Sequence, residues 1–68
     1  MPIDYTNQGK RVRARHPTRT IAKLLPEGWT GEVQYELRDP VLNKHLVEVV
    51  WDEDGSQTPI FLSEIEWL

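Results

Sequence analysis

Residues 30–52 read TGEVQYELRDPVLNKHLVEVVWD, and this stretch predicts a β-sheet. Apolar and polar residues alternate over residues 30–37, the period-two pattern of a strand with one face in a core. Residues 45–52 are rich in β-branched residues and are apolar on both faces, which is typical of a central strand. The loop between the two segments is short and contains Asp39-Pro40. We therefore expect the two segments to pair as antiparallel neighbours.

Shorter strand patterns flank this pair. Residues 10–16 alternate until Pro17, which ends a strand because proline has no amide proton. After the acidic turn that ends at Gly55, residues 58–63 begin another strand, and residues 66–68 form a last short one. Four or five short strands joined by turns predict an all-β fold, a small antiparallel barrel, because closing the sheet removes exposed edges. We expect its most buried side chains to be Val33, Tyr35, Val47, Val49, Ile60 and Leu62.

Residues 18–28, TRTIAKLLPEG, admit two interpretations. In the first, Thr20 caps a short helical turn that carries Ile21, Leu24 and Leu25. In the second, the segment is an ordered loop that places the same three aliphatic side chains on the core.

The ends of the domain follow from length and composition. Residues 1–9 are polar, contain Pro2 and Gly9, and are expected to form a flexible N-terminal lead-in. A chain of 68 residues is long enough for one domain, which we place at residues 10–68.

The composition indicates a soluble protein of a reducing compartment. The sequence has no Cys, so it forms neither a disulfide nor a thiolate metal site. Its start, MPIDYTNQGK, has no apolar run typical of a signal peptide, and no stretch approaches the roughly 20 apolar residues of a membrane span. We therefore expect a cytoplasmic protein that does not enter a membrane.

Three segments resemble the small SH3-like barrels: GWTGEVQYEL (28–37), VEVVWDEDG (47–55) and TPIFLSEIEWL (58–68). That group includes KOW-type RNA-binding modules, the variable chain of ferredoxin-thioredoxin reductase and a small stromal subunit of photosystem I. A one-turn 3-10 element typically precedes the last strand in these domains, and the resemblance places it at residues 62–65. The type II dihydrofolate reductase is also a small barrel of this kind. The Gln and Tyr of its active-site segment are missing from residues 58–61, so the resemblance implies no reductase activity.

The basic residues are concentrated near the N-terminus. The net charge is only −3, yet six of the eight Lys and Arg residues lie between Lys10 and Lys23. Asp4 is the only acidic residue before Glu27. The chain is therefore strongly dipolar, and its basic segment is the best indication of a binding surface.

Three arginines in this segment are predicted to form a row. Residues two apart on a strand share one face at a spacing of roughly 6.5–7 Å, so Arg11, Arg13 and Arg15 project together. That spacing is near the distance between successive phosphates, and the row would suit nucleic acid or an acidic protein. In the alternative interpretation the row is a solvated face whose arginines pair across the sheet with Glu32, Glu36 or Glu48.

Trp29 is a further candidate because it lies in a loop between Gly28 and Gly31. It is either an exposed contact residue or a lid that folds back on one end of the barrel. Trp51 and Trp67 are expected in the core. The candidate partner-binding set is Lys10, Arg11, Arg13, Arg15, Arg19, Lys23 and Trp29.

The sequence contains no motif for catalysis or metal binding. His16 and His45 have no ligand partners at metal-site spacing. The acidic turn at residues 52–54 lacks the alternating ligand register of a calcium loop. A Gly-x-Ser-x-Gly elbow and a Gly-rich phosphate loop are both missing. We therefore predict a non-enzymatic protein with no cofactor and no metal.

These observations favour a non-catalytic interaction module or accessory subunit that docks an acidic protein partner through its basic N-terminal strand. The alternative is a KOW-like nucleic-acid-binding module that uses the same arginines on phosphates. Acidic side chains around the arginine row would favour the protein contact, and their absence would favour nucleic acid. The sequence leaves the oligomeric state open.

Overall fold

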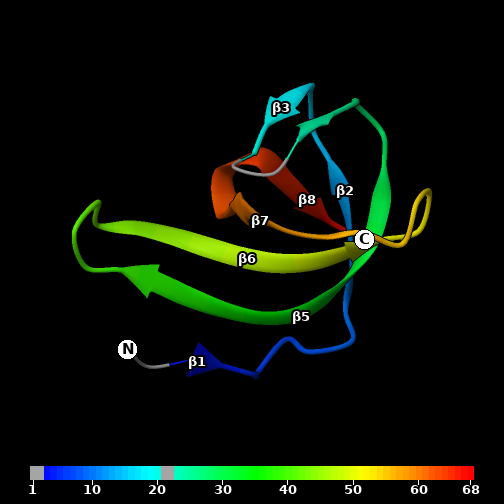
Figure 1. The fold of residues 1–68 in the computed structure, drawn as a ribbon. Coiled ribbons are helices and arrows are strands. Elements are labelled where there is room, and N and C mark those ends of the chain that lie inside the picture. Colours follow the sequence, from blue (N-terminus) through cyan, green and yellow to red (C-terminus); the bar gives the residue numbers. More distant parts are fainter. Residues whose placement is uncertain (1–2, 21–22) are drawn as a thin grey trace.

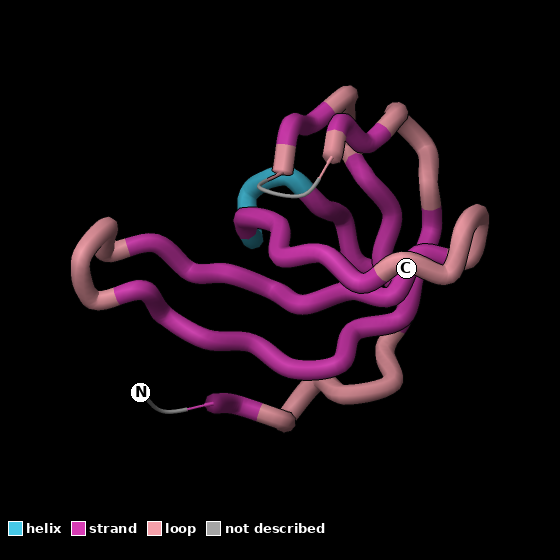
Figure 2. Tube along the Cα trace, viewed as in Figure 1, coloured by secondary structure: helices cyan, strands magenta, loops and turns pink. Residues whose placement is uncertain are grey.

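The structure, a computed structural model that describes residues 3–20 and 23–68, consists mostly of β-strands (Figure 1 and Figure 2). The 3-10 turn η1 (Leu62–Glu64) precedes the last strand. The prediction of an all-β fold with one short helical or 3-10 turn is confirmed for the described residues, but these form eight strands where four or five were expected, because β1, β3 and β4 are two-residue strands. The strands are β1 (Ile3–Asp4), β2 (Arg11–Ala14), β3 (Thr18–Arg19), β4 (Leu24–Leu25), β5 (Thr30–Asp39), β6 (Lys44–Trp51), β7 (Gln57–Phe61) and β8 (Ile65–Trp67).

The long hairpin β5–β6 organises the main sheet. Its register runs from Gly31 opposite Trp51 to Asp39 opposite Lys44, so the predicted antiparallel pairing is confirmed. The two strands run side by side to a shared turn at one end of the molecule (Figure 1). The main sheet has the order β7-β6-β5-β2-β8, and β1 pairs with β5.

The main sheet is not closed into a barrel, and the sequence-based expectation was wrong on this point. The strands β7 and β8 end the hydrogen-bonded order and do not pair with each other. The chain passes from β7 to β8 through η1, which carries the last strand onto β2 instead of back onto β7. One edge on each side of the sheet is left without a strand partner among the described residues.

The segment after β2 forms a β-hairpin where one interpretation expected a helix. β3 and β4 pair with Thr18 opposite Leu25. The Thr20 amide donates to the Lys23 carbonyl at 2.8 Å, and the Lys23 amide donates to Thr20 Oγ1 at 3.0 Å. Side-chain bonds of this kind compete with helical backbone bonds. Of the three aliphatic residues expected here, Leu25 is buried, Leu24 is exposed and Ile21 lies outside the described residues.

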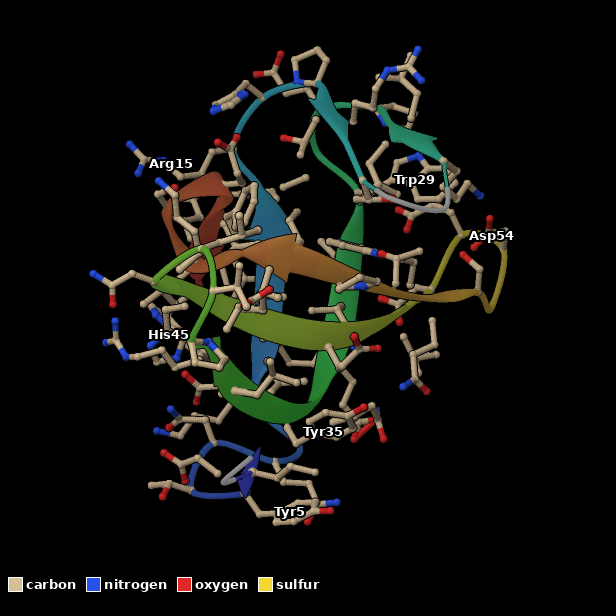
Figure 3. The ribbon with its side chains drawn as sticks, turned by 60° about the vertical axis from the view of Figure 1, so that its left-hand side comes forward. Tyr5, Arg15, Trp29, Tyr35, His45 and Asp54 are labelled. Carbon is tan, nitrogen blue, oxygen red and sulfur yellow. The ribbon has the colours of Figure 1, made fainter. Side chains whose placement is uncertain are left out.

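Part of the segment expected as a lead-in lies against the main sheet. Ile3 pairs with Leu37 of β5, and the Gly9 amide donates to the Val33 carbonyl at 2.8 Å. The ring of Tyr5 lies 5.9 Å from the ring of Tyr35, centroid to centroid, and both rings lie at the same end of the molecule (Figure 3).

A β-bulge in β5 explains where the predicted core was wrong. Val33 pairs with Val49 but Tyr35 pairs with Glu48, so one extra residue interrupts the alternation. Past the bulge Glu36 is buried, whereas Tyr35 is only half-buried. The predicted core residues Val33, Val47, Val49 and Ile60 are buried, whereas Leu62 in η1 is half-buried.

Two tryptophans were expected in the core, and one of them is there. Trp51 is fully buried, and its Nε1 donates to Thr58 Oγ1 at 2.8 Å. Trp67 is 43% exposed, so the expectation for that residue was wrong. It lies at the end of β8, which pairs on one side only and therefore leaves its side chains less covered.

The buried carboxylate of Glu36 ties three segments together. Its side chain accepts a hydrogen bond from Asn7 Nδ2 at 2.6 Å, and His45 Nε2 lies 2.7 Å from its other oxygen. A buried charge without such partners would be costly. The two contacts join the segment after β1 and the start of β6 to the middle of β5.

A close backbone approach at Gly31 fixes how β5 lies on β6. A Cβ atom on Gly31 would lie 2.5 Å from Val49 Cγ1 and 2.6 Å from the Val50 carbonyl oxygen. Gly31 also pairs with Val12 of β2 on its other side. Any larger residue would therefore push β5 away from β6, next to the place where β5 also pairs with β2.

We predict that Gly31→Ala destabilises the protein strongly. The added methyl group overpacks the contact with β6, which typically costs about 1–3 kcal/mol or more. The measurement is the free energy of unfolding in urea. Glu32→Ala is the matched control, because Glu32 is exposed in the same strand and should change stability by about 0.5 kcal/mol or less. Equal stability of the two variants would contradict the close approach.

Candidate binding surface

The strand β2 carries the predicted arginine row on its outer face. Arg11 and Arg13 are exposed, and the residues beside them, Val12 and Ala14, are buried. Arg15 follows directly and is also exposed. The alternation inferred from the sequence is therefore present, and the three arginines are accessible from outside.

Acidic side chains pair with two of the three arginines. Arg11 Nη1 donates to Asp52 Oδ1 at 3.1 Å, and a second contact joins the same two groups. Arg13 Nε donates to Glu66 Oε1 at 2.8 Å. The hydrogen bonds between Arg11 and Asp52 lower the pKa of Asp52 and raise that of Arg11. These acids differ from the partners considered from the sequence, which were Glu32, Glu36 and Glu48.

Three further cations of the basic segment, Lys10, Arg15 and Arg19, have no acidic partner in the part of the chain that the structure describes. Arg15 Nη1 donates to the Ser63 carbonyl at 3.4 Å, beside η1. Arg19 in β3 and Lys10 before β2 are exposed and form no described ion pair. The cations without an acidic partner are thus Lys10 before β2, and Arg15 and Arg19 near η1 and β3, whereas Lys23 pairs with Asp54.

Trp29 is half-buried and packs against the core. Lys23 Nζ lies 4.9 Å from the centre of the Trp29 ring and also pairs with Asp54 in the turn before β7. Trp29 and Asp54 lie on the same side of the molecule, and Arg15 projects from the other side (Figure 3). This packing fits the interpretation of Trp29 as a lid better than that of an exposed contact residue. Lys23 and Trp29 hold two loops together there.

A hollow that the sequence did not indicate lies between β3, the turn after β5 and β7. It has a volume of about 400 Å³ and a mostly apolar lining. Leu42, which is 57% exposed, and Phe61, which is 39% exposed, contribute to it. The sequence signal was the apolar pair Val41-Leu42 inside a loop, which is unusual for a solvated turn. Its lining includes Arg19, Asp39, Leu42, Leu46, Pro59 and Phe61.

The two histidines both contact carboxylates. His16 Nε2 lies 2.8 Å from Glu64 Oε2, and His45 contacts Glu36. Residues 3–20 and 23–68 contain no cluster of three or more side chains suited to hold a metal ion.

Comparison with known proteins returned no match: no family model, no curated protein and no solved structure is similar to this chain. Within the described segments no helix has the length and apolar character needed to cross a membrane. The interpretation of the surface therefore rests on its geometry.

We predict that acid releases Lys23 from Asp54. Hydrogen bonds from Lys23 and Ser56 lower the pKa of Asp54 from 3.8 to about 2. Because the folded-state pKa is depressed, the carboxylate stabilises the fold at higher pH, and this contribution is lost as the pH falls from 3.8 towards about 2. The indole N–H resonance of Trp29 should move with a midpoint near pH 2, since Lys23 covers its ring.

The control is Asp54→Asn, which removes the charge without acid. At neutral pH its Trp29 resonance should match the low-pH position of the wild-type protein and should not titrate further near pH 2. The buried Trp51 indole provides an internal reference. A Trp29 midpoint near pH 4, or one that persists in Asp54→Asn, would show that another carboxylate controls this contact.

Proposed function

We propose that the protein is a non-catalytic interaction module, or an accessory subunit, that docks a protein partner with an acidic surface. The observation that carries this proposal is the pairing of Arg11 with Asp52 and of Arg13 with Glu66. A strand that tracks phosphates needs its arginines free, whereas acids around a basic strand favour a shaped contact with one partner. Complementary charge then mainly speeds and orients association.

We centre the proposed contact on the part of the basic segment that directly follows β2. Arg15 and Arg19 are exposed there without acidic partners in the described residues, and η1 and β3 lie beside them. Lys10 adds charge at the other end of the segment. Arg11 and Arg13 contribute less, because a partner must compete with the acids that already bind them.

We propose that the fold is a variant of the SH3-like domains, and the order of its elements supports this although the sheet is not closed. In chain order, β2 is followed by the paired strands β3 and β4, by the long strands β5 and β6, and by the shorter strand β7. The 3-10 turn η1 then precedes the last strand β8. Small domains of this architecture serve widely as binding modules, so the fold is compatible with docking and does not establish it. The lack of cysteine supports a cytoplasmic location as part of the same proposal.

We predict that Arg15→Gln combined with Arg19→Gln weakens partner binding more than Arg11→Gln combined with Arg13→Gln. The first pair removes unpaired charge, whereas the second removes charge that the protein already neutralises. The measurement is co-purification of the tagged protein from its native cell, with and without nuclease, followed by binding assays on the proteins recovered. All four arginines are exposed, so thermal unfolding should change little.

The outcome that would contradict this proposal is binding that nuclease abolishes. Purified protein that binds generic single-stranded RNA or duplex DNA at physiological salt would favour the KOW-like alternative. In that case each lost phosphate contact should reduce the slope of log affinity against log salt by about one unit. Unfolding of the variants would instead show that the arginines are structural.

A further inference from the structure

We propose that the hollow between β3, the β5–β6 turn and β7 binds a short peptide segment of the partner, in which large apolar side chains stand beside acidic ones. This inference rests on the proposed docking function and names the part of the partner that is recognised. It is argued from three features of the hollow: its apolar lining, the unpaired cations around it and its size.

The apolar lining is exposed without a covering element. Leu42 is 57% exposed at the tip of the longest hairpin, and Phe61 is 39% exposed at the end of β7. Phe61 lies opposite Leu46 in the ladder, so the two form a continuous apolar wall with Pro59. Exposed apolar patches of this kind on a small protein commonly mark an interaction site. An apolar side chain of the partner would remove this surface from water.

The cations around the hollow are free to bind an acidic group. Arg19 lines the hollow and forms no described ion pair. Lys44 lines an adjoining hollow that shares Phe61, and the Arg15 side chain donates to the Ser63 carbonyl beside it. Three cations thus face the two carboxylates of Asp39 and Glu64, which leaves a small excess of positive charge at this place.

Two acidic side chains at the same place, Asp39 and Glu64, accept hydrogen bonds within the protein. Asp39 Oδ1 accepts hydrogen bonds from the amides of Val41 at 2.9 Å and of Leu42 at 3.3 Å. Glu64 Oε2 accepts a hydrogen bond from Thr18 Oγ1 at 3.0 Å and contacts His16. The amides and the hydroxyl that donate to them are neutral, so both carboxylates keep their negative charge. They are outnumbered by the three cations Arg15, Arg19 and Lys44, and an acidic peptide is therefore still favoured over a basic one.

The size of the hollow limits the occupant. Its volume of about 400 Å³ lies near the lower end of the range for ligand sites, about 300–1,000 Å³. It therefore accommodates a few side chains and not a large cofactor. A short peptide segment can insert apolar side chains into the hollow and place carboxylates on its rim. Such a segment matches both the shape of the hollow and the charge of the cations around it.

The test uses the full chain and three blocked peptides, GEDLFEDG, GKKLFKKG and GEDAAEDG, in NMR titrations. The acidic apolar peptide should shift the backbone amides of Leu42, Phe61 and Arg19. The basic peptide and the peptide without large apolar residues should each bind at least about fivefold more weakly, because each lacks one of the two required features. Shifts confined to β2, or equal binding of all three peptides, would overturn the inference.

Substitutions in the lining of the hollow and beside it test whether the peptide binds in the hollow itself. Leu42→Ser should weaken binding of GEDLFEDG about tenfold, as the loss of a central apolar contact does. Val41→Ser should leave it unchanged, because Val41 is 89% exposed but does not line the hollow. Arg19→Gln should weaken binding and reduce its salt dependence. Equal effects of Leu42→Ser and Val41→Ser, or an unchanged affinity of Arg19→Gln, would overturn the inference.

The two proposals fail in different ways. If acidic proteins recovered from the native cell require Arg15 and Arg19 but bind Leu42→Ser normally, docking stands and the peptide site is wrong. If a single-stranded RNA shifts the same amides and displaces the peptide, the hollow serves nucleic acid and both proposals fall.

Discussion

The sheet depends on one position where no side chain is tolerated. Gly31 pairs with Val12 on one side and with Trp51 on the other, so β2, β5 and β6 meet there. A Cβ atom would collide with the Val50 carbonyl oxygen, which is backbone and cannot rotate away. Trp51 lies at this contact, is fully buried, and donates from its indole to Thr58. The strand β2 pairs with β5 here with Val12 buried and Arg11 and Arg13 exposed, so the arginines stand on the outer face beside this contact.

The alternation of apolar and polar residues predicted where the longer strands lie, but it did not predict the bulge in β5 or which side chains pair between strands. The pairing of residues 30–37 with 45–52 and the burial of Val33, Val47 and Val49 followed from the period of two. The bulge between Val33 and Tyr35 could not be predicted in this way, because no residue type in the sequence indicates it. Its extra residue exchanges the buried and exposed faces of the strand. Within β5 the alternation is therefore shifted beyond the bulge, and the buried residue is Glu36 and not Tyr35. The ion pairs of Arg11 with Asp52 and of Arg13 with Glu66 were not predicted, because the sequence does not show which segments lie beside β2 in the sheet.

The charge asymmetry of the sequence has a different meaning once the fold is known. Six of the eight basic residues fall in one segment, yet acidic side chains pair with Arg11, Arg13 and Lys23. Arg15 and Arg19, near η1 and β3, have no acidic partner among the described residues. The free cations stand next to exposed apolar side chains that the sequence analysis did not single out. Charge and apolar surface together define a smaller and more selective site than the arginine row suggested.

The two unpaired edges of the sheet bear on how the protein behaves at high concentration. An open sheet can add strands from neighbouring chains, which is the first step of amyloid-like aggregation. The outer strand β7 has Pro59 in its middle, where no amide proton is available to a growing ladder. The outer strand β8 has only three residues, and so short an edge offers few backbone groups to a neighbouring chain. The open architecture therefore need not make the chain prone to fibril formation, because each edge is a poor template for the next molecule.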